Sequence, residues 1–157
     1  GLGDVYKRQG GGMPIGAFSS SSKIMDTLSD NPKLGHITTF GGHPVIAASA
    51  LATLKEITSS NLMKKTLEKE KIIRSELKHP LILEIRGKGL MLCLITKSPE
   101  ITNKLIIKAM DKGLILFWLL YEPKAIRITP PLTISVKELK KGCNIILSIL
   151  DDIDNEC

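Results

Sequence analysis

The sequence predicts an α/β fold in which helices cover a small sheet. After residue 80, short apolar runs with strand character alternate with segments of helical periodicity, and glycine or proline separates many of them. The chain has 157 residues and is 43% hydrophobic, which is enough to bury a core. It shows no internal repeat and no low-complexity linker, so a layered α/β sandwich is the expected architecture.

The first third of the chain predicts two helices and a glycine-rich turn. Residues 10–18 form the turn and lead into a short strand, without the spacing of a P-loop or a dinucleotide fingerprint. Ser21 or Ser22 is expected to cap a short helix over residues 23–28. An alanine-rich helix is expected from about residue 43 to residue 58.

The remainder predicts the sheet and the helices that cover it. A helix over residues 62–78 follows Ser60-Asn61 and ends at His79-Pro80, and its inner face is expected to hold Leu62, Ile72, Ile73 and Leu77. The later elements are, in order, a strand over 81–85, a turn over 87–89, a strand over 90–95, a helix over 100–112 with Gly113 at its C-cap, strands over 114–120 and 125–129, and a helix over 135–153 with a Ser135–Glu138 capping box. The most apolar run, residues 114–121, is interpreted as a buried core strand.

Charge, motifs and cysteine content indicate which kinds of partner and metal the chain is not expected to bind. The net charge is +6, but basic residues alternate with glutamate, as in residues 64–71, which is typical of a solvated helix face with i,i+4 pairs. No nucleic-acid motif, signal peptide or tract of ~20 apolar residues is visible, so we expect no nucleic-acid partner and no membrane. Cys93, Cys143 and Cys157 lack metal-ligand spacing, so reduced thiols in the cytoplasm and no metal are expected.

Residues 38–44, Thr-Thr-Phe-Gly-Gly-His-Pro, combine two hydroxyls, two glycines and the start of a helix. Hydroxyls and unpaired N–H groups at a helix start can hold an anion, which indicates phosphate binding. An ordinary N-cap turn explains the same residues equally well.

Arg127 is the second candidate site residue. It lies between Ile126 and Ile128, so strand alternation turns its guanidinium away from the core. At a strand end beside Pro130-Pro131 it can receive a carboxylate through two hydrogen bonds. The alternative is a structural ion pair with an acidic residue of a neighbouring helix.

Residues 1–9 do not resemble the start of a domain. They contain no methionine and no periodicity, and we interpret them as a non-native segment derived from a sequencing adapter. The rest is then expected to be the C-terminal part of a longer protein.

Four stretches carry a resemblance to a known family: residues 10–17, 38–44, 86–91 and 127–132. In this order they resemble the C-terminal part of the class III, fold-type I, pyridoxal-phosphate-dependent aminotransferases, the group that contains acetylornithine, ornithine and 4-aminobutyrate aminotransferases. The resemblance implies that residues 10–58 end the cofactor-binding large domain and include the connecting helix. Residues 59–157 then form the C-terminal α+β small domain.

The resemblance also assigns roles to single residues. Lys7 stands three residues before the triple glycine and matches by register the lysine to which the cofactor is attached. Thr39 corresponds to the residue that contacts the cofactor phosphate across a dimer interface, and Thr38 to its neighbour on the substrate side. Arg127 corresponds to the receptor of the substrate α-carboxylate, which favours that role over the ion pair. His43 is expected only to begin the helix.

The implied activity is transfer of an amino group from an amino acid or (acyl)diamine to a 2-oxo acid such as 2-oxoglutarate, with pyridoxal 5′-phosphate in a homodimer. The acidic partner of the pyridine nitrogen, the phosphate loop and the ring-stacking aromatic are expected upstream of Gly10, so the chain alone is expected to be inactive. Two alternatives remain. One is an aminomutase of the same fold, and the other is a non-catalytic α/β interaction module that binds an acidic partner through its basic helices.

Overall fold

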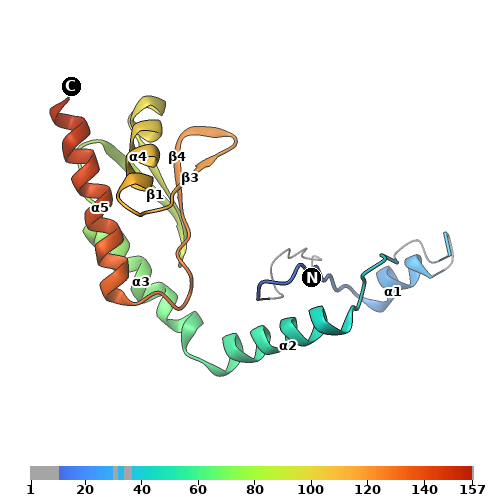
Figure 1. The fold of residues 1–157 in the computed structure, drawn as a ribbon. Helices are drawn as coiled ribbons and strands as arrows, with labels where there is room; N and C mark the ends of the chain where they lie inside the picture. The colour runs from blue at the N-terminus through green and yellow to red at the C-terminus, as the bar shows by residue number, and fades with distance from the viewer. Residues whose placement is uncertain (1–10, 30–31, 34–36, 157) are drawn as a thin grey trace. The chain divides into compact units, whose positions relative to one another are not determined.

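A computed structural model describes residues 11–29, 32–33 and 37–156 of the chain (Figure 1). The chain divides into two compact units, Gly1–Ser60 and Asn61–Cys157, which are described separately. Their boundary lies close to residue 58, where the connecting helix is expected to end. Their assignment to a large and a small domain remains a prediction.

The N-terminal unit contains one long helix. The segment expected to be helical over 23–28 forms α1, Ser22–Met25, and a 3-10 turn η1, Asp26–Leu28. Helix α2, Pro44–Ser59, begins with proline at its first position, where the fixed φ suits a helix and no N–H is required. None of these three elements has a buried residue.

The C-terminal unit is a four-stranded antiparallel sheet with three helices, and the predicted α/β class is confirmed. Its elements are α3 (Leu62–Glu76), β1 (Ile82–Lys88), β2 (Met91–Thr96), α4 (Pro99–Asp111), β3 (Phe117–Leu119), β4 (Glu122–Ile128) and α5 (Val136–Asn155). The strand order is β1-β2-β4-β3. All expected elements of this region occur, although several bounds differ.

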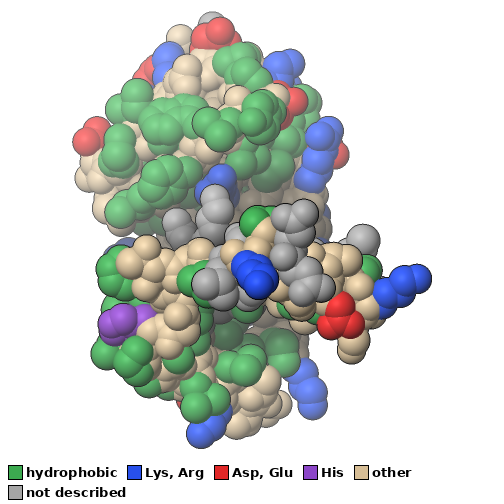
Figure 2. Space-filling view, turned by 90° about the vertical axis from the view of Figure 1, so that its right-hand side faces the viewer, with side chains coloured by type: hydrophobic (Ala, Val, Ile, Leu, Met, Phe, Trp, Pro, Cys, Tyr) green, Lys and Arg blue, Asp and Glu red, His purple; other side chains and the backbone are tan. Residues whose placement is uncertain are grey.

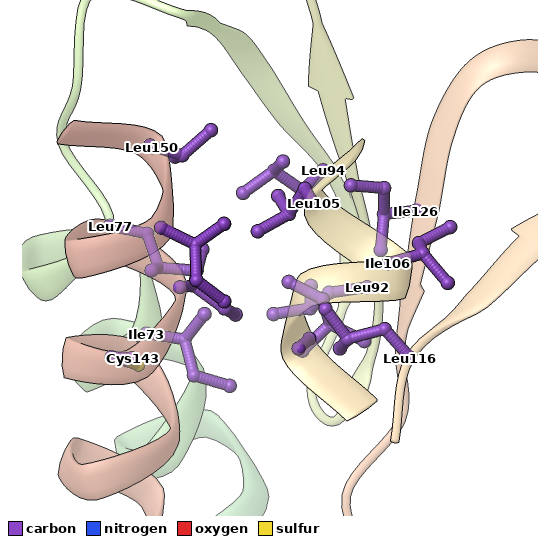
Figure 3. Close-up of a cluster of buried hydrophobic side chains, with 14 of the residues drawn as sticks. Ile73, Leu77, Leu92, Leu94, Leu105, Ile106, Leu116, Ile126, Cys143 and Leu150 are labelled. Atoms are coloured by element: carbon purple, nitrogen blue, oxygen red, sulfur yellow. The ribbon is translucent and has the colours of Figure 1, made fainter. Parts of the chain in front are cut away.

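One hydrophobic core joins the sheet to all three helices of this unit (Figure 3). Alternate residues of β2 and β4 point into it, and two of them, Leu94 and Ile126, are at most 1% exposed. The helices contribute Ile73, Leu105, Ile149 and other aliphatic side chains. Among the expected inner residues of α3, Ile73 and Leu77 are buried, whereas Leu62 and Ile72 are only partly buried.

Local capping fixes several helix ends. The predicted capping box of α5 is confirmed, because Ser135 Oγ accepts from the Glu138 N–H and the Glu138 side chain accepts from the Ser135 N–H. Gly113 has φ 77° just after α4, where Leu114 N donates to Ala109 O at 2.8 Å and Gly113 N donates to Met110 O at 3.0 Å. This pair of bonds is a Schellman motif, so the expected glycine cap is confirmed.

The turn between β1 and β2 lies later than predicted. Lys88 pairs with Met91, so the connection is Gly89-Leu90 and β1 continues through Gly87. A Cβ on Gly87, which has φ 107°, would lie 2.1 Å from the Met91 carbonyl oxygen. Glycine is therefore required there by close strand pairing rather than by the turn itself.

The interpretation of residues 114–121 as a buried core strand is wrong. Only Phe117–Leu119 forms a strand, β3, and it lies at the sheet edge with β4 as its one partner among the described strands. Leu116 is buried, but the following side chains are largely exposed: Phe117 59%, Trp118 45%, Leu120 91% and Tyr121 97%. An edge position and a tight hairpin leave few neighbours to cover them. In the upper part of Figure 2, hydrophobic side chains accordingly spread over one side of this unit.

Candidate functional site

Residues 38–44 form two successive turns that lead into α2. Gly41 N donates to Thr38 O at 3.0 Å, and His43 N donates to Phe40 O at 3.2 Å. A Cβ on Gly41 would lie 2.9 Å from Thr38 Oγ1, so glycine allows this hydroxyl to lie close to the backbone. Gly42 has φ 72° with nothing within 4 Å of its Cβ position, which leaves open space beside the turn.

The donors of this turn fit a phosphate group. No hydrogen bond joins the Thr38 or Thr39 hydroxyl to another residue in the described part of the chain, and both side chains are exposed. His43 is the N-cap residue of α2, as expected, but no side chain caps this helix. The first N–H groups of α2 therefore lack the side-chain acceptor that an ordinary N-cap provides. The segment 38–44 carries no acidic side chain that would repel an anion.

The glycine-rich turn packs against the same helix. A Cβ on Gly11 would lie 2.1 Å from Thr53 Oγ1 of α2, so the backbone passes directly beside that side chain. The expected short strand is reduced to single bridges at Met13 and Ile15. Two of the four family-like stretches thus flank one helix.

His43 has a feature that sequence reasoning missed. Its Nδ1 atom is buried and has no hydrogen-bond partner among the described residues. The Phe40 and His43 rings lie 6.3 Å apart at 57°. No sequence signal indicated the buried nitrogen, because it depends on how the turn folds back.

Arg127 lies on the open face of the sheet, as alternation predicts. Its neighbours Ile126 and Ile128 are buried, whereas its own side chain is exposed. Its register partners are Cys93 on β2 and Phe117 on β3. No hydrogen bond or ion pair connects the guanidinium to another described residue, so the alternative of an ion pair with a neighbouring helix finds no partner there.

The turn at residues 86–91 is anchored by α3. The Glu70 carboxylate accepts from Gly89 N at 2.6 Å and from Arg74 Nε at 2.9 Å. Arg74 also donates to the carbonyls of Ile85 at 2.5 Å and Gly87 at 2.9 Å. The bond from Gly89 N–H, and then that from Arg74, lowers the pKa of Glu70. The Glu70–Arg74 pair is one of the expected i,i+4 pairs.

Lys69 corrects the interpretation of residues 64–71 as a solvated face. Its side chain is buried, at 7% exposure, and its ammonium donates to Leu132 O at 2.6 Å. Helical spacing carried this signal, since Lys69 lies four residues before the core residue Ile73 and eight before Leu77. The alternation of lysine and glutamate in residues 64–71 led to the prediction of an exposed side chain instead.

The structure does not bring all the candidate residues into one described site. Lys7 lies outside the described residues. Thr38 and Thr39 belong to the N-terminal unit and Arg127 to the C-terminal unit, so their common pocket stays a prediction. Burial raises the pKa of both free thiols described, Cys93 and Cys143, the latter to about 11. In the described ranges, no cluster of three metal-ligating side chains occurs and no helix has the length and apolar character to cross a bilayer.

Comparison with known proteins identifies the family. Residues 4–150 match the family described as Aminotransferase class-III. The chain belongs to the class-III aminotransferases. Members of this family depend on pyridoxal 5′-phosphate, so the expected family and cofactor are confirmed.

Relatives extend well beyond the part of a class-III aminotransferase that this chain contains. The acetylornithine aminotransferase of Caldanaerobacter subterraneus is 34% identical over 97% of this chain and 37% of its own length. The leucine/methionine racemase of Thermococcus litoralis is 32% identical over 96% of this chain and 36% of its own. The ornithine aminotransferase structure from Toxoplasma gondii aligns with a TM-score of 0.83 and 25% identity, over 98% of this chain and 37% of that one. The chain thus spans little more than a third of these proteins.

Proposed function

We propose that this chain forms the C-terminal part of an aminotransferase that moves an amino group from an amino acid or (acyl)diamine to a 2-oxo acid. Membership of the family supports the reaction class. The structural observation that carries the proposal is Arg127, an exposed guanidinium on the open sheet face without a partner among the described residues. A planar guanidinium in that state suits a substrate carboxylate.

Different residues of the chain are proposed to bind the cofactor and the substrate. When bound, pyridoxal phosphate supplies an electron sink for the charge that develops on the substrate carbon. The hydroxyls of Thr39 and Thr38, with the first N–H groups of α2, hold its phosphate. Arg127 orients the substrate through its carboxylate, and Lys7, assigned by register alone, moves the proton.

The whole protein is proposed to be a cytoplasmic homodimer that contains this chain, or its native equivalent with other residues in place of 1–9, at its C-terminus. An interface with a second subunit on helix α2 is consistent with its exposed apolar side chains, because Val45, Leu51 and Leu54 are more than half exposed. The 157-residue chain by itself is proposed to be inactive. Turnover of an amino donor by that chain with added pyridoxal phosphate would contradict this.

Two substitutions in the full-length protein test the roles of the site residues. Arg127→Ala should raise KM for each substrate that carries a carboxylate by roughly 100-fold and leave the cofactor absorbance unchanged. Thr39→Ala should weaken cofactor retention by about tenfold, because one hydrogen bond to a charged group is lost. Thr58→Ala is the control, since that hydroxyl donates only to carbonyls of its own helix. Unchanged KM in Arg127→Ala would overturn the carboxylate assignment.

A second candidate reaction is racemisation, which the similarity to a leucine/methionine racemase favours. Incubation of the full-length protein with one amino-acid enantiomer and no 2-oxo acid separates the two. A racemase destroys the optical rotation, whereas an aminotransferase stops after one half-reaction. An aminomutase would instead yield an isomer with the amino group on another carbon. An interaction module would be insensitive to Arg127→Ala and would bind an acidic partner with strong salt dependence.

A further inference from the structure

We propose that Lys69 is a positioning residue for Arg127. The inference rests on the proposed function of Arg127 as a carboxylate receptor. Lys69 reaches from α3 to the segment that follows β4, and its Nζ lies 2.6 Å from the carbonyl oxygen of Leu132, 63 residues away in the sequence. This bond fixes the chain beyond the strand that carries Arg127.

The segment between β4 and α5 has few other hydrogen bonds, although Leu132 and Ile134 pack against the hydrophobic core. The pairing of β4 with β2 ends at Ile128. Pro130 and Pro131 have no N–H group, so neither can donate a backbone bond. One local bond follows, from Ile134 N to Pro131 O at 3.0 Å. Within the described residues, Lys69 provides the one side-chain hydrogen bond to residues 129–134.

An apolar side chain at position 69 could not make the hydrogen bond that Lys69 makes. Burial of an ammonium group is costly unless charge and hydrogen bonds compensate. The bond to Leu132 uses one of three donors, and no acidic side chain of the described chain pairs with Lys69. Methionine would fill a similar volume without that cost. It could not hold the carbonyl, however, so the charge makes a tether that an apolar residue cannot.

The same helix also anchors the turn at residues 86–91 through Glu70 and Arg74. Arg86 and Arg127 both lie opposite Cys93, on its two sides, so these anchored segments lie at the two sides of one strand. Hydrogen bonds from helix α3 therefore hold one segment on each side of β2. The hydrogen bond from Lys69 to Leu132 is the one that holds the segment following Arg127.

The test compares Lys69→Met with Lys71→Met in the full-length protein. Lys71 is exposed on the same helix and makes no hydrogen bond to a described residue, so it controls for loss of one positive charge. Lys69→Met should raise KM for the carboxylate substrates about tenfold with kcat and cofactor absorbance unchanged. Lys71→Met should leave KM within about twofold. Lys69→Arg, which keeps a charged donor, should recover most of the affinity.

Amide hydrogen exchange in the 157-residue chain gives a readout that does not require activity. In Lys69→Met, the Ile134 amide should exchange at least about fivefold faster, while core amides of α4 remain protected. If Lys69→Met does not fold, Lys69→Gln is measured by the same criteria. Unchanged Ile134 exchange together with unchanged KM would overturn the proposal. If the wild-type full-length protein lacks transamination, the proposed function fails, and exchange alone then decides whether Lys69 tethers this segment.

Discussion

The two units of the chain differ in how far their apolar side chains are buried. In the C-terminal unit, Leu105, Ile149 and Leu150 are fully buried in a core shared by the sheet and the helices. In the N-terminal unit, the 16-residue helix α2 has no buried residue, and Val45 and Leu54 are each 59% exposed. The difference shows that the C-terminal unit has a hydrophobic core of its own, whereas α2 buries no side chain among the described residues of its unit.

The largest expected effect comes from matched leucine truncations in the two units. Leu105→Ala should lower the free energy of unfolding by about 3 kcal/mol, because it opens a cavity in the core. Leu54→Ala should change it by less than about 0.5 kcal/mol, since its side chain is exposed. Far-UV circular dichroism follows the helices of both units during urea unfolding, and the fluorescence of Trp118, the one tryptophan of the chain, reports on the C-terminal unit alone. Equal losses in the two variants would contradict the proposed contrast.

Glycine substitutions should show the same contrast at smaller size. Gly87→Ala should cost about 2–3 kcal/mol, because its φ of 107° and the Met91 carbonyl at 2.1 Å both oppose a Cβ. Gly42→Ala has a positive φ but no neighbour within 4 Å, and it lies in the other unit. It should leave the Trp118-monitored transition unchanged. A shift of that midpoint by Gly42→Ala would show that the units unfold together.

Cap substitutions should have a smaller effect. Ser135→Ala removes the capping box of α5 and should cost about 1 kcal/mol in the same unfolding experiment. Ser21→Ala is the matched control, because Ser21 occupies the N-cap position of α1 without a side-chain capping bond. A loss for Ser21→Ala as large as that for Ser135→Ala would refute the assignment.

The smallest effect concerns acid stability of the C-terminal unit. Hydrogen bonds from Lys108 and then Lys104 lower the pKa of Glu156 from 4.5 to about 2. Because the folded pKa is depressed, the contribution to stability is complete above pH 4.5 and is lost as the pH falls toward about 2. Glu156→Gln should make the unfolding midpoint less dependent on pH in that interval. An identical pH profile for both proteins would show that the ion pairs contribute nothing.

Prediction from sequence succeeded where a few neighbouring residues decide the structure. The start of α5, the glycine after α4 and the outward side chain of Arg127 follow from the Ser135–Glu138 spacing, from Gly113 and from strand alternation. For the site, sequence reasoning identified the hydroxyl-glycine turn and the guanidinium. Their roles remain predictions, as does that of Lys7.

The two largest errors concern surroundings that the local sequence does not contain. Residues 114–121 are apolar enough for a core, yet the strand order places β3 at an edge. The run around Lys69 has the charge of a solvated face, yet helix packing turns that lysine inward. Periodicity predicts which side of a helix or strand a residue occupies, but not whether that side packs against another element or faces solvent.

The sequence alone determined the start of α5, the glycine cap after α4 and the outward face of Arg127, because capping bonds and side-chain alternation act over a few residues. Only the tertiary structure decided the order of the strands, the burial of Lys69 and its bond to Leu132, because these depend on segments that are distant in the sequence. Strand β2 pairs with β4 across the intervening α4 and β3, and Lys69 and Leu132 are 63 residues apart.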